Sequence, residues 1–205
     1  SIDSVMTDPS YRKKGYARQL LEEVLIDHPA DVIFLSGNEA VTEFYPRFGF
    51  EPIKHIKYKD LNIERYTLGD KGRKLNIDQD IKLIDEYVRK RLKNSKDMYV
   101  YHDDYIKMFY MLYLYNDCIY LHKDAIVICQ KKNNILYVHD IYMISEQSIY
   151  DLIGPYTKDV DHIQYSFEVK IDNLTPYEDS NSYFFVKTNL MALKQPWSYP
   201  GTSVT

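Results

Sequence analysis

Basic residues and a glycine stand where a helix is expected to begin, in the stretch TDPSYRKKGYARQLLEEVL that covers residues 7–25. The start of a helix leaves backbone N–H groups unpaired and carries a partial positive charge, so it attracts anions. Glycine at this junction lets a phosphate approach the backbone closely, and a small residue two positions later leaves that approach open. Arg12, Gly15 and Ala17 fill this pattern, R-x-x-G-x-A. By itself the pattern leaves two interpretations open, a phosphate site and a solvated basic helix end.

The order of the predicted elements places this junction between a strand and a helix. Residues 2–6 are predicted to form a short strand, and a turn follows at 8–10 because Pro9 restricts its own backbone and that of the preceding residue. Apolar side chains then recur with helical spacing from Gly15, and Pro29 ends that helix. The apolar run 31–35 predicts a buried strand parallel to the first, residues 39–48 a second helix, and residues 50–58 another strand. This order is typical of an α/β unit.

A second set of residues follows the predicted strand 31–35 directly. Asn38, Tyr45 and the pair Gly49-Phe50 lie in NEAVTEFYPRFGF, residues 38–50. Together with R-x-x-G-x-A, they resemble the GCN5-related N-acetyltransferase (GNAT) superfamily. In that family R/Q-x-x-G-x-G/A opens the helix that binds the pyrophosphate of acetyl-CoA, and an Asn, a Tyr seven residues later and a Gly-Phe pair follow. The resemblance covers residues 2 to about 58, and the joint match is more specific than either half.

The resemblance implies a cofactor site at the first helix. Backbone groups of the first strand would bond the pantetheine arm, amides from Lys13 to Arg18 would hold the pyrophosphate, and Asn38 would bond the pantetheine or cap the next helix. The set of cofactor-binding residues implied in this way is Val5, Met6, Thr7, Arg12, Lys13, Lys14, Gly15, Tyr16, Ala17, Arg18 and Asn38.

The resemblance also implies direct acyl transfer, in which a free amine attacks the thioester carbonyl and positioning supplies much of the rate. Tyr45 would protonate the departing CoA thiolate as general acid. The alternative is that Tyr45 is a core aromatic residue, since Phe44 and Phe48 flank it. The general base is left open: Asp3 lies on the first strand, where bases of the family often sit, but it could be only a surface carboxylate, and a relaying water would also suffice.

Composition narrows the class of protein. A net charge of −4 and a pI near 5.9 argue against general nucleic-acid binding, which needs a basic face. No apolar run approaches the ~20 residues that span a bilayer. Two cysteines without metal spacing and six scattered histidines predict no metal site and a reduced, cytoplasmic setting. The 21 tyrosines are interpreted as a compositional bias.

The rest of the chain predicts a second unit. Residues 59–76 are polar and are interpreted as a linker, which gives domains at 1–75 and 76–205. In the second we expect helices from Asp78 and over 103–115, a hairpin turning at Asn133-Asn134, a helix capped by Ser145, and strands over 163–169 and 183–188. This α+β unit resembles a degenerate GNAT-like half, as in bacterial tandem proteins. It lacks R-x-x-G-x-G/A and is not expected to bind CoA.

The expected fold is therefore α/β (α+β): a GNAT-like mixed sheet flanked by helices, incomplete at its N-terminus, plus a second α+β domain. Only four residues precede Val5, where the family has about three strands and two helices. We expect either that the N-terminal part of the first domain is missing from this chain, or that another chain, a second copy included, completes the sheet.

The predicted function is an acetyl-CoA-dependent N-acetyltransferase that acts on a primary amine of a small molecule or a peptide. Two alternatives stay open at this point. One is a non-catalytic CoA-binding sensor or scaffold of the same fold. The other is an unrelated α/β interaction module that carries the motif by chance.

Overall fold

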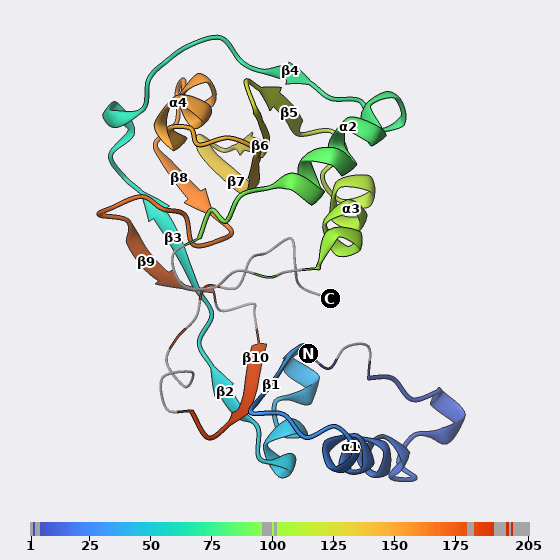
Figure 1. The fold of residues 1–205 in the computed structure, drawn as a ribbon. Helices are drawn as coiled ribbons and strands as arrows, with labels where there is room; N and C mark the ends of the chain where they lie inside the picture. The colour runs from blue at the N-terminus through green and yellow to red at the C-terminus, as the bar shows by residue number, and fades with distance from the viewer. Residues whose placement is uncertain are drawn as a thin grey trace. The chain divides into compact units, whose positions relative to one another are not determined.

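The computed structural model describes residues 2, 5–95, 100, 102–179, 183–190, 196 and 198. The chain divides into two compact units. The first is built from residues 1–55 and 179–197, and the second from residues 56–178 and 198–204. The C-terminal strand of the described chain thus belongs to the same unit as the N-terminal helix, as the red and blue segments of Figure 1 show.

The first unit places one helix beside a small sheet. Helix α1 (Tyr16–Asp27) is followed by strand β1 (Val32–Gly37), 3-10 turns at Glu39–Val41 and Tyr45–Phe48, and strand β2 (Glu51–Ile53). Strand β10 (Tyr183–Thr188) lies between β1 and β2 and is antiparallel to both. The core of this unit is one cluster of buried side chains: Leu21, Leu35, Tyr45, Phe50 and Phe185.

Two predicted elements of this unit differ in the structure. Of the expected strand 2–6, residues 3 and 4 lie outside the described part, Val5 and Met6 are irregular, and the Ile2 amide donates to the Phe34 carbonyl at 3.1 Å. Strand β1 pairs along its length with β10, and this pair is antiparallel, whereas the sequence predicts a parallel pair with residues 2–6. The predicted helix 39–48 is wrong: two 3-10 turns stand there, because Pro46 has no N–H to donate and disfavours the helical conformation of the residue before it.

The boundary between the units also differs from the expected one at 75/76. The predicted strand 50–58 is two strands, β2 in the first unit and β3 (Ile56–Asp60) in the second. Residues 59–76 are part of the second unit and contain a 3-10 turn (Ile63–Arg65) and strand β4 (Arg73–Lys74). Asp60, Tyr66 and Leu75 in this polar stretch are buried. The Tyr66 hydroxyl bonds the Asp60 carboxylate and, at 2.8 Å, the Tyr165 hydroxyl. Because these polar groups are paired with one another, they can be buried although the composition of the stretch predicts exposure.

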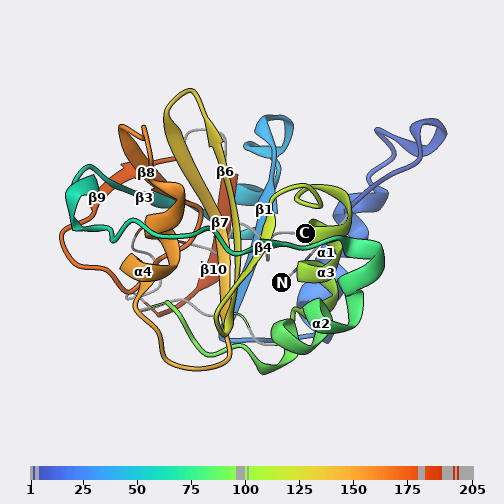
Figure 2. The same cartoon turned by 90° about the horizontal axis from the view of Figure 1, so that it is seen from above.

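The second unit is a seven-stranded sheet in the order β4-β5-β6-β7-β8-β3-β9. Its further strands are β5 (Ile119–His122), β6 (Ala125–Lys132), β7 (Ile135–Met143), β8 (His162–Tyr165) and β9 (Thr175–Glu178). Strands β7 and β8 are parallel and the other pairs antiparallel. Helices α2 (Ile77–Lys90) and α3 (Asp104–Tyr113) lie on one side of β5–β7 and α4 (Ile149–Ile153) on the other, as Figure 2 shows.

Strand β6 divides its side chains between two cores because successive residues point to opposite faces. Ala125, Val127 and Cys129 pack in the cluster that contains α4, and Ile126 and Ile128 in the cluster that contains α2 and α3. Both faces of the sheet are therefore covered at β6, which explains why its first five residues, 125–129, are all apolar.

The hairpin and the helices of this unit follow the sequence closely, and their caps differ by a few residues. Asn133 and Asn134 have φ of 51° and 57° and join β6 to β7 as predicted. Asn76, not Asp78, caps α2 through bonds from two backbone amides. Ser148, not Ser145, caps α4.

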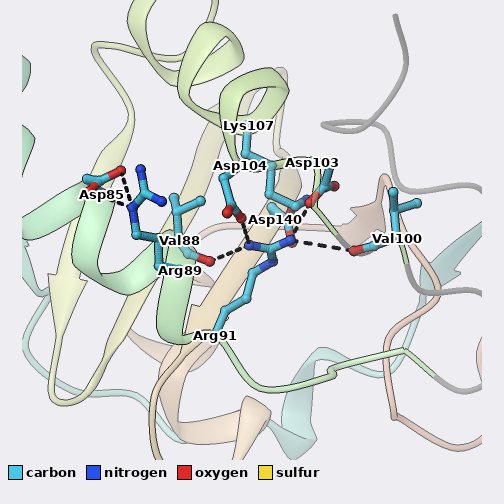
Figure 3. Close-up of polar contacts among 9 residues, drawn as sticks. All are labelled: Asp85, Val88, Arg89, Arg91, Val100, Asp103, Asp104, Lys107 and Asp140. Carbon is cyan, nitrogen blue, oxygen red and sulfur yellow. Dashed lines mark hydrogen bonds and ion pairs between the residues drawn. The ribbon is translucent and has the colours of Figure 1, made fainter.

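A buried charge network holds the end of α2 against α3 (Figure 3). The Arg91 guanidinium, whose side chain is 7% exposed, pairs with Asp103 and, at 2.7 Å, with Asp104. It also donates to the Val88 and Val100 carbonyls. Because the two carboxylates neutralise the guanidinium charge, Arg91 can be buried in the loop after α2.

A lysine extends this network to the sheet. Lys107 Nζ lies 2.9 Å from the Asp140 carboxylate and 3.5 Å from that of Asp103, and all three side chains are at most 5% exposed. Its ammonium also lies 5.3 Å from the centre of the Tyr142 ring. The network thus joins α3 to β7.

His139 on β7 gives a pH-dependent prediction. Its ring stacks on Tyr115 with centroids 4.1 Å apart, and its Nε2 lies 2.8 Å from the Gln130 side-chain nitrogen. Burial, with the nearby charge of Lys57, lowers the pKa of His139 to about 4. An unfolded histidine has a pKa of about 6.5, so the unfolded chain takes up this proton first and stability falls as the pH drops from about 6.5 towards 4. An NMR titration should find the His139 ring neutral down to about pH 5, and titration near the ordinary value would contradict this.

Candidate functional site

The loop before α1 is fixed by its own hydrogen bonds. Asp8 caps a 3-10 turn (Pro9–Tyr11) by accepting from the Ser10 amide at 2.9 Å. Bonds from the Ser10 hydroxyl and amide lower the pKa of Asp8. The Arg12 Nε donates to the Thr7 carbonyl at 3.1 Å, which ties the two sides of the loop together. The predicted turn at 8–10 is confirmed.

Two left-handed residues turn this loop into the helix. Lys13 has φ +62° and Gly15, the residue that precedes α1, has φ +83°. Glycine adopts this conformation without steric cost, which explains its place here. A Cβ added at Gly15 would meet nothing within 4 Å, so the approach to the helix start is open.

The backbone amides of this junction are free to bind an anion. No described residue accepts a hydrogen bond from the six N–H groups of residues 13–18, and the first amide of this region that is bonded is that of Gln19, to the Gly15 carbonyl at 3.0 Å. Residues 13–16 and Arg18 are exposed and Ala17 is half-buried. The helix start therefore offers a row of donors together with its partial positive charge.

The basic side chains contribute less than the backbone. Arg18 pairs with Glu22 at 2.9 Å, and Lys14 Nζ lies 5.0 Å from the centre of the Tyr11 ring. Ion pairs between exposed groups of this kind contribute only about 0–1 kcal/mol. The solvated-end interpretation accounts for these side chains and for the free amides, which every helix start has. What this junction adds is the left-handed Gly15, where nothing blocks the approach of an anion to the amides.

Asn38 caps the turn that follows β1. Its side-chain oxygen accepts from the Ala40 amide at 3.0 Å, the capping alternative of the sequence analysis. Gly37, which that analysis did not single out, sits just before it. A Cβ there would lie 2.6 Å from the Val41 side chain, so any side chain at this position would displace the first of the two turns.

Tyr45 is held in the core of the first unit. Its side chain is 5% exposed, and its ring lies 5.3 Å from Phe44, 6.1 Å from Phe50 and 5.4 Å from Phe185, centre to centre. The ring therefore packs as a core aromatic residue. Burial raises the pKa of its hydroxyl, which keeps the proton on the oxygen at neutral pH.

The structure brings part of the predicted site together. Leu21 of α1 and Tyr45 share one cluster, so the helix that carries the free amides and the 3-10 turn that carries the tyrosine are packed in one unit. Val5 and Met6 are exposed, at 36% and 86%, and Thr7 is half-buried. Phe185 completes the surroundings of Tyr45 from the far end of the chain, and no local signal in the sequence indicates that role.

Within the described part of the chain, no group of three or more His, Cys, Asp or Glu side chains could hold a metal ion. Among the same residues, no helix is long and apolar enough to cross a membrane.

Residues 1–52 match the model of the acetyltransferase (GNAT) domain family. The matched segment, about a quarter of the chain, is the one that carries the motifs, and the match agrees with the superfamily predicted from them. No curated protein matches the chain significantly in sequence.

Solved structures resemble the chain over most of its length. A probable N-acyltransferase of unknown function from Enterococcus faecalis V583 is 12% identical with a TM-score of 0.51, over 88% of this chain and 52% of that one. Eis1 from Mycobacterium abscessus is 16% identical with a TM-score of 0.50, over 86% and 53%. A GCN5-related N-acetyltransferase from Kribbella flavida is 15% identical with a TM-score of 0.48, over 90% and 50%.

The chain thus spans about half the length of these structures. At such low identity the likeness bears on the fold alone, and it confirms the predicted GNAT-like α+β class.

Proposed function

We propose that this protein is an acetyl-CoA-dependent N-acetyltransferase that moves an acetyl group to a primary amine by direct transfer. The observation that carries the proposal is the row of free amides at residues 13–18, in a segment that matches the GNAT domain model. A pyrophosphate carries two adjacent anionic groups and needs several donors at one place, which this helix start offers.

The other cofactor-binding residues predicted from the sequence contribute less to binding than the amides of residues 13–18. The Asn38 oxygen is used by the Ala40 amide, which leaves the Asn38 side-chain nitrogen to donate to the pantetheine arm. Backbone groups of Val5, Met6 and Thr7 would bond the pantetheine, because the Thr7 carbonyl, which accepts from Arg12, keeps a second lone pair. Arg12 thereby acts on the shape of the loop, and Lys13 and Lys14 add a weak attraction for the phosphates.

In the proposed reaction the amine nitrogen attacks the thioester carbonyl, a carbon–nitrogen bond forms and the carbon–sulfur bond breaks. The Tyr45 hydroxyl gives its proton to the departing thiolate, and the proton lost by the amine returns through solvent. One observation supports this role: no described residue hydrogen-bonds the Tyr45 hydroxyl, so its proton is available to a leaving group. Burial raises the pKa of Tyr45, which makes the hydroxyl a weaker acid and keeps it protonated. A proton donor must be protonated at the working pH, and this environment favours that state.

An assay over a panel of small amines and lysine peptides tests the reaction. With acetyl-CoA present, we expect free thiol to appear in step with the acetylated amine, detected by mass. Acetyl-CoA that raises the melting temperature without any thiol release would favour the non-catalytic sensor. The absence of any thermal shift would favour the unrelated interaction module.

The protein would work in a reduced, cytoplasmic setting, and a second chain would complete the sheet of the first unit. The second unit, a degenerate GNAT-like half in this account, would bind no CoA.

A further inference from the structure

A pocket in the second unit collects lysines that belong to no other site. Its volume is about 330 Å³, and it opens between β5, β6, β7 and the segment after α4. It is lined by Lys71, Tyr120, Cys129, Gln130, Lys131, Leu136, Tyr156, Lys158 and Asp159. The size is that of a small-ligand pocket.

The rim of this pocket is positively charged in an acidic protein. Lys71, Lys131 and Lys158 come from three separate segments of the chain and are exposed, and Asp159 is the one carboxylate in the lining. No described acidic side chain forms an ion pair with any of the three lysines. Three cations thus converge on one cavity while the whole chain carries −4. Such a cavity concentrates anions.

Two of the lysines are positioned by contacts that leave their charge available. Lys131 Nζ donates to the Lys158 carbonyl at 2.8 Å, which uses one of its three protons and ties β6 to the loop after α4. Lys71 Nζ lies 5.9 Å from the centre of the Tyr156 ring. Gly72 lets this segment approach β5, since a Cβ there would lie 2.3 Å from the Leu121 carbonyl oxygen.

One part of the pocket's lining is aromatic and apolar. The rings of Tyr120 and Tyr156 lie 5.1 Å apart, centre to centre, and Leu136 and Cys129 are buried beside them. The Tyr156 hydroxyl accepts from the Gly72 amide at 3.2 Å, which fixes the ring. Rings and aliphatic carbons suit a flat apolar body, and lysines at the rim suit an anionic group attached to it.

From this combination we infer that the second unit carries a binding site for a small phosphorylated ligand with a planar ring, of about the size of a mononucleotide. The phosphate lies among Lys71, Lys131 and Lys158, and the ring lies against Tyr120 and Tyr156. The site is separate from the helix start of the first unit and does not depend on the proposed acetyl transfer.

Calorimetry with adenosine monophosphate as the probe tests this site. Adenosine and inorganic phosphate are the two partial probes, and each is expected to bind at least about tenfold more weakly than the whole, because each meets only part of the site. Equal binding of inorganic phosphate and adenosine monophosphate would overturn the ring contact. No binding of adenosine monophosphate at millimolar concentration would overturn the site.

A matched pair of triple variants locates the binding. Changing Lys71, Lys131 and Lys158 to glutamine is expected to weaken binding of the nucleotide at least about tenfold. Each ion pair between an exposed lysine and the phosphate contributes up to about fivefold to the affinity. The control changes Lys82, Lys132 and Lys170, exposed lysines outside the pocket, to glutamine. Lys132 follows Lys131 on β6 and points to the opposite face. Equal affinity of the two triple variants would contradict the assignment.

A second readout does not depend on how the variants fold. Adding the nucleotide to the unchanged protein is expected to shift the NMR amide signals of Gln130, Lys131 and Asp159 and to leave those of residues 13–18 in place. Shifts confined to residues 13–18 would assign the nucleotide to the helix start and overturn the pocket.

Discussion

Replacing Tyr45 with phenylalanine is expected to lower kcat for acetyl transfer about 100-fold and to leave the Kd for acetyl-CoA unchanged. Proton donation by a positioned side chain contributes about 10²–10⁴ in rate, and the lower end suits a thiolate leaving group. A change in kcat without a change in binding marks an interaction made in the transition state. Steady-state kinetics and calorimetry measure the two quantities.

The packing around Tyr45 allows this substitution to remove the hydroxyl without disturbing the core. Phenylalanine keeps the ring among Phe44, Phe50 and Phe185 and removes only the hydroxyl, which no described residue bonds. The melting temperature should therefore stay the same. Tyr11→Phe, at an exposed tyrosine of the same unit, is the matched control and should leave kcat unchanged.

The pH profile adds a second criterion for Tyr45. Because burial raises the pKa of its hydroxyl above the ordinary value, the donor stays protonated across the neutral and mildly alkaline range. The advantage of the wild type over Tyr45→Phe should thus be constant between about pH 7 and pH 9. Equal kcat in the two proteins would remove Tyr45 from the mechanism and leave it a core residue.

Replacing Lys107 with methionine is expected to lower the free energy of unfolding by about 3–5 kcal/mol. The substitution removes the cation that lies 2.9 Å from Asp140 and 3.5 Å from Asp103, with all three side chains nearly inaccessible to solvent. Asp140 then loses the charge of Lys107 and keeps the bond from the Ile141 amide. Leaving a carboxylate buried without its cation is what makes such a change costly.

Chemical denaturation of two further variants separates this effect from loss of packing. Lys82→Met on the exposed side of α2 should leave the denaturation midpoint unchanged. Adding Asp140→Asn to Lys107→Met should recover part of the lost stability, because the remaining buried group is then neutral. A midpoint for Lys107→Met equal to that of Lys82→Met would show that the network carries no stability.

The local features of this fold were readable from the sequence. The turn at Asp8-Pro9, the start of α1 after Gly15 and the Asn133-Asn134 hairpin depend on residues that restrict or free their own backbone, so a few letters determine them. The strand at 31–35 is equally local, because a short apolar run bounded by polar residues favours it.

The features that failed depend on contacts across the chain. Nothing near Phe185 indicates that β10 inserts between β1 and β2. Residues 59–76 look like a linker because Asp60 and Tyr66 are polar, and only their partners Arg65 and Tyr165 explain their burial. The helix expected at 39–48 had the right periodicity, and Pro46 prevented it.

For the candidate site, the sequence could predict the anion-binding geometry and could not predict the environment of Tyr45. The free amides follow from the helix start itself, which every helix has. The raised pKa of Tyr45 follows from burial that Phe185 completes, a contact made by residues 140 positions apart. The hydroxyl's role therefore depends on information that local spacing does not hold.

Calorimetric titration of acetyl-CoA into Gly15→Asp and Gly15→Asn tests the central claim most directly. The positive φ of Gly15 strains any side chain there, but Asp and Asn are among the non-glycine residues that most often adopt this conformation and they have the same shape, so the two variants should fold alike. They differ in one negative charge placed where the pyrophosphate is proposed to lie. The account predicts that Gly15→Asp binds acetyl-CoA at least about tenfold more weakly than Gly15→Asn, and equal affinities would contradict the proposed site.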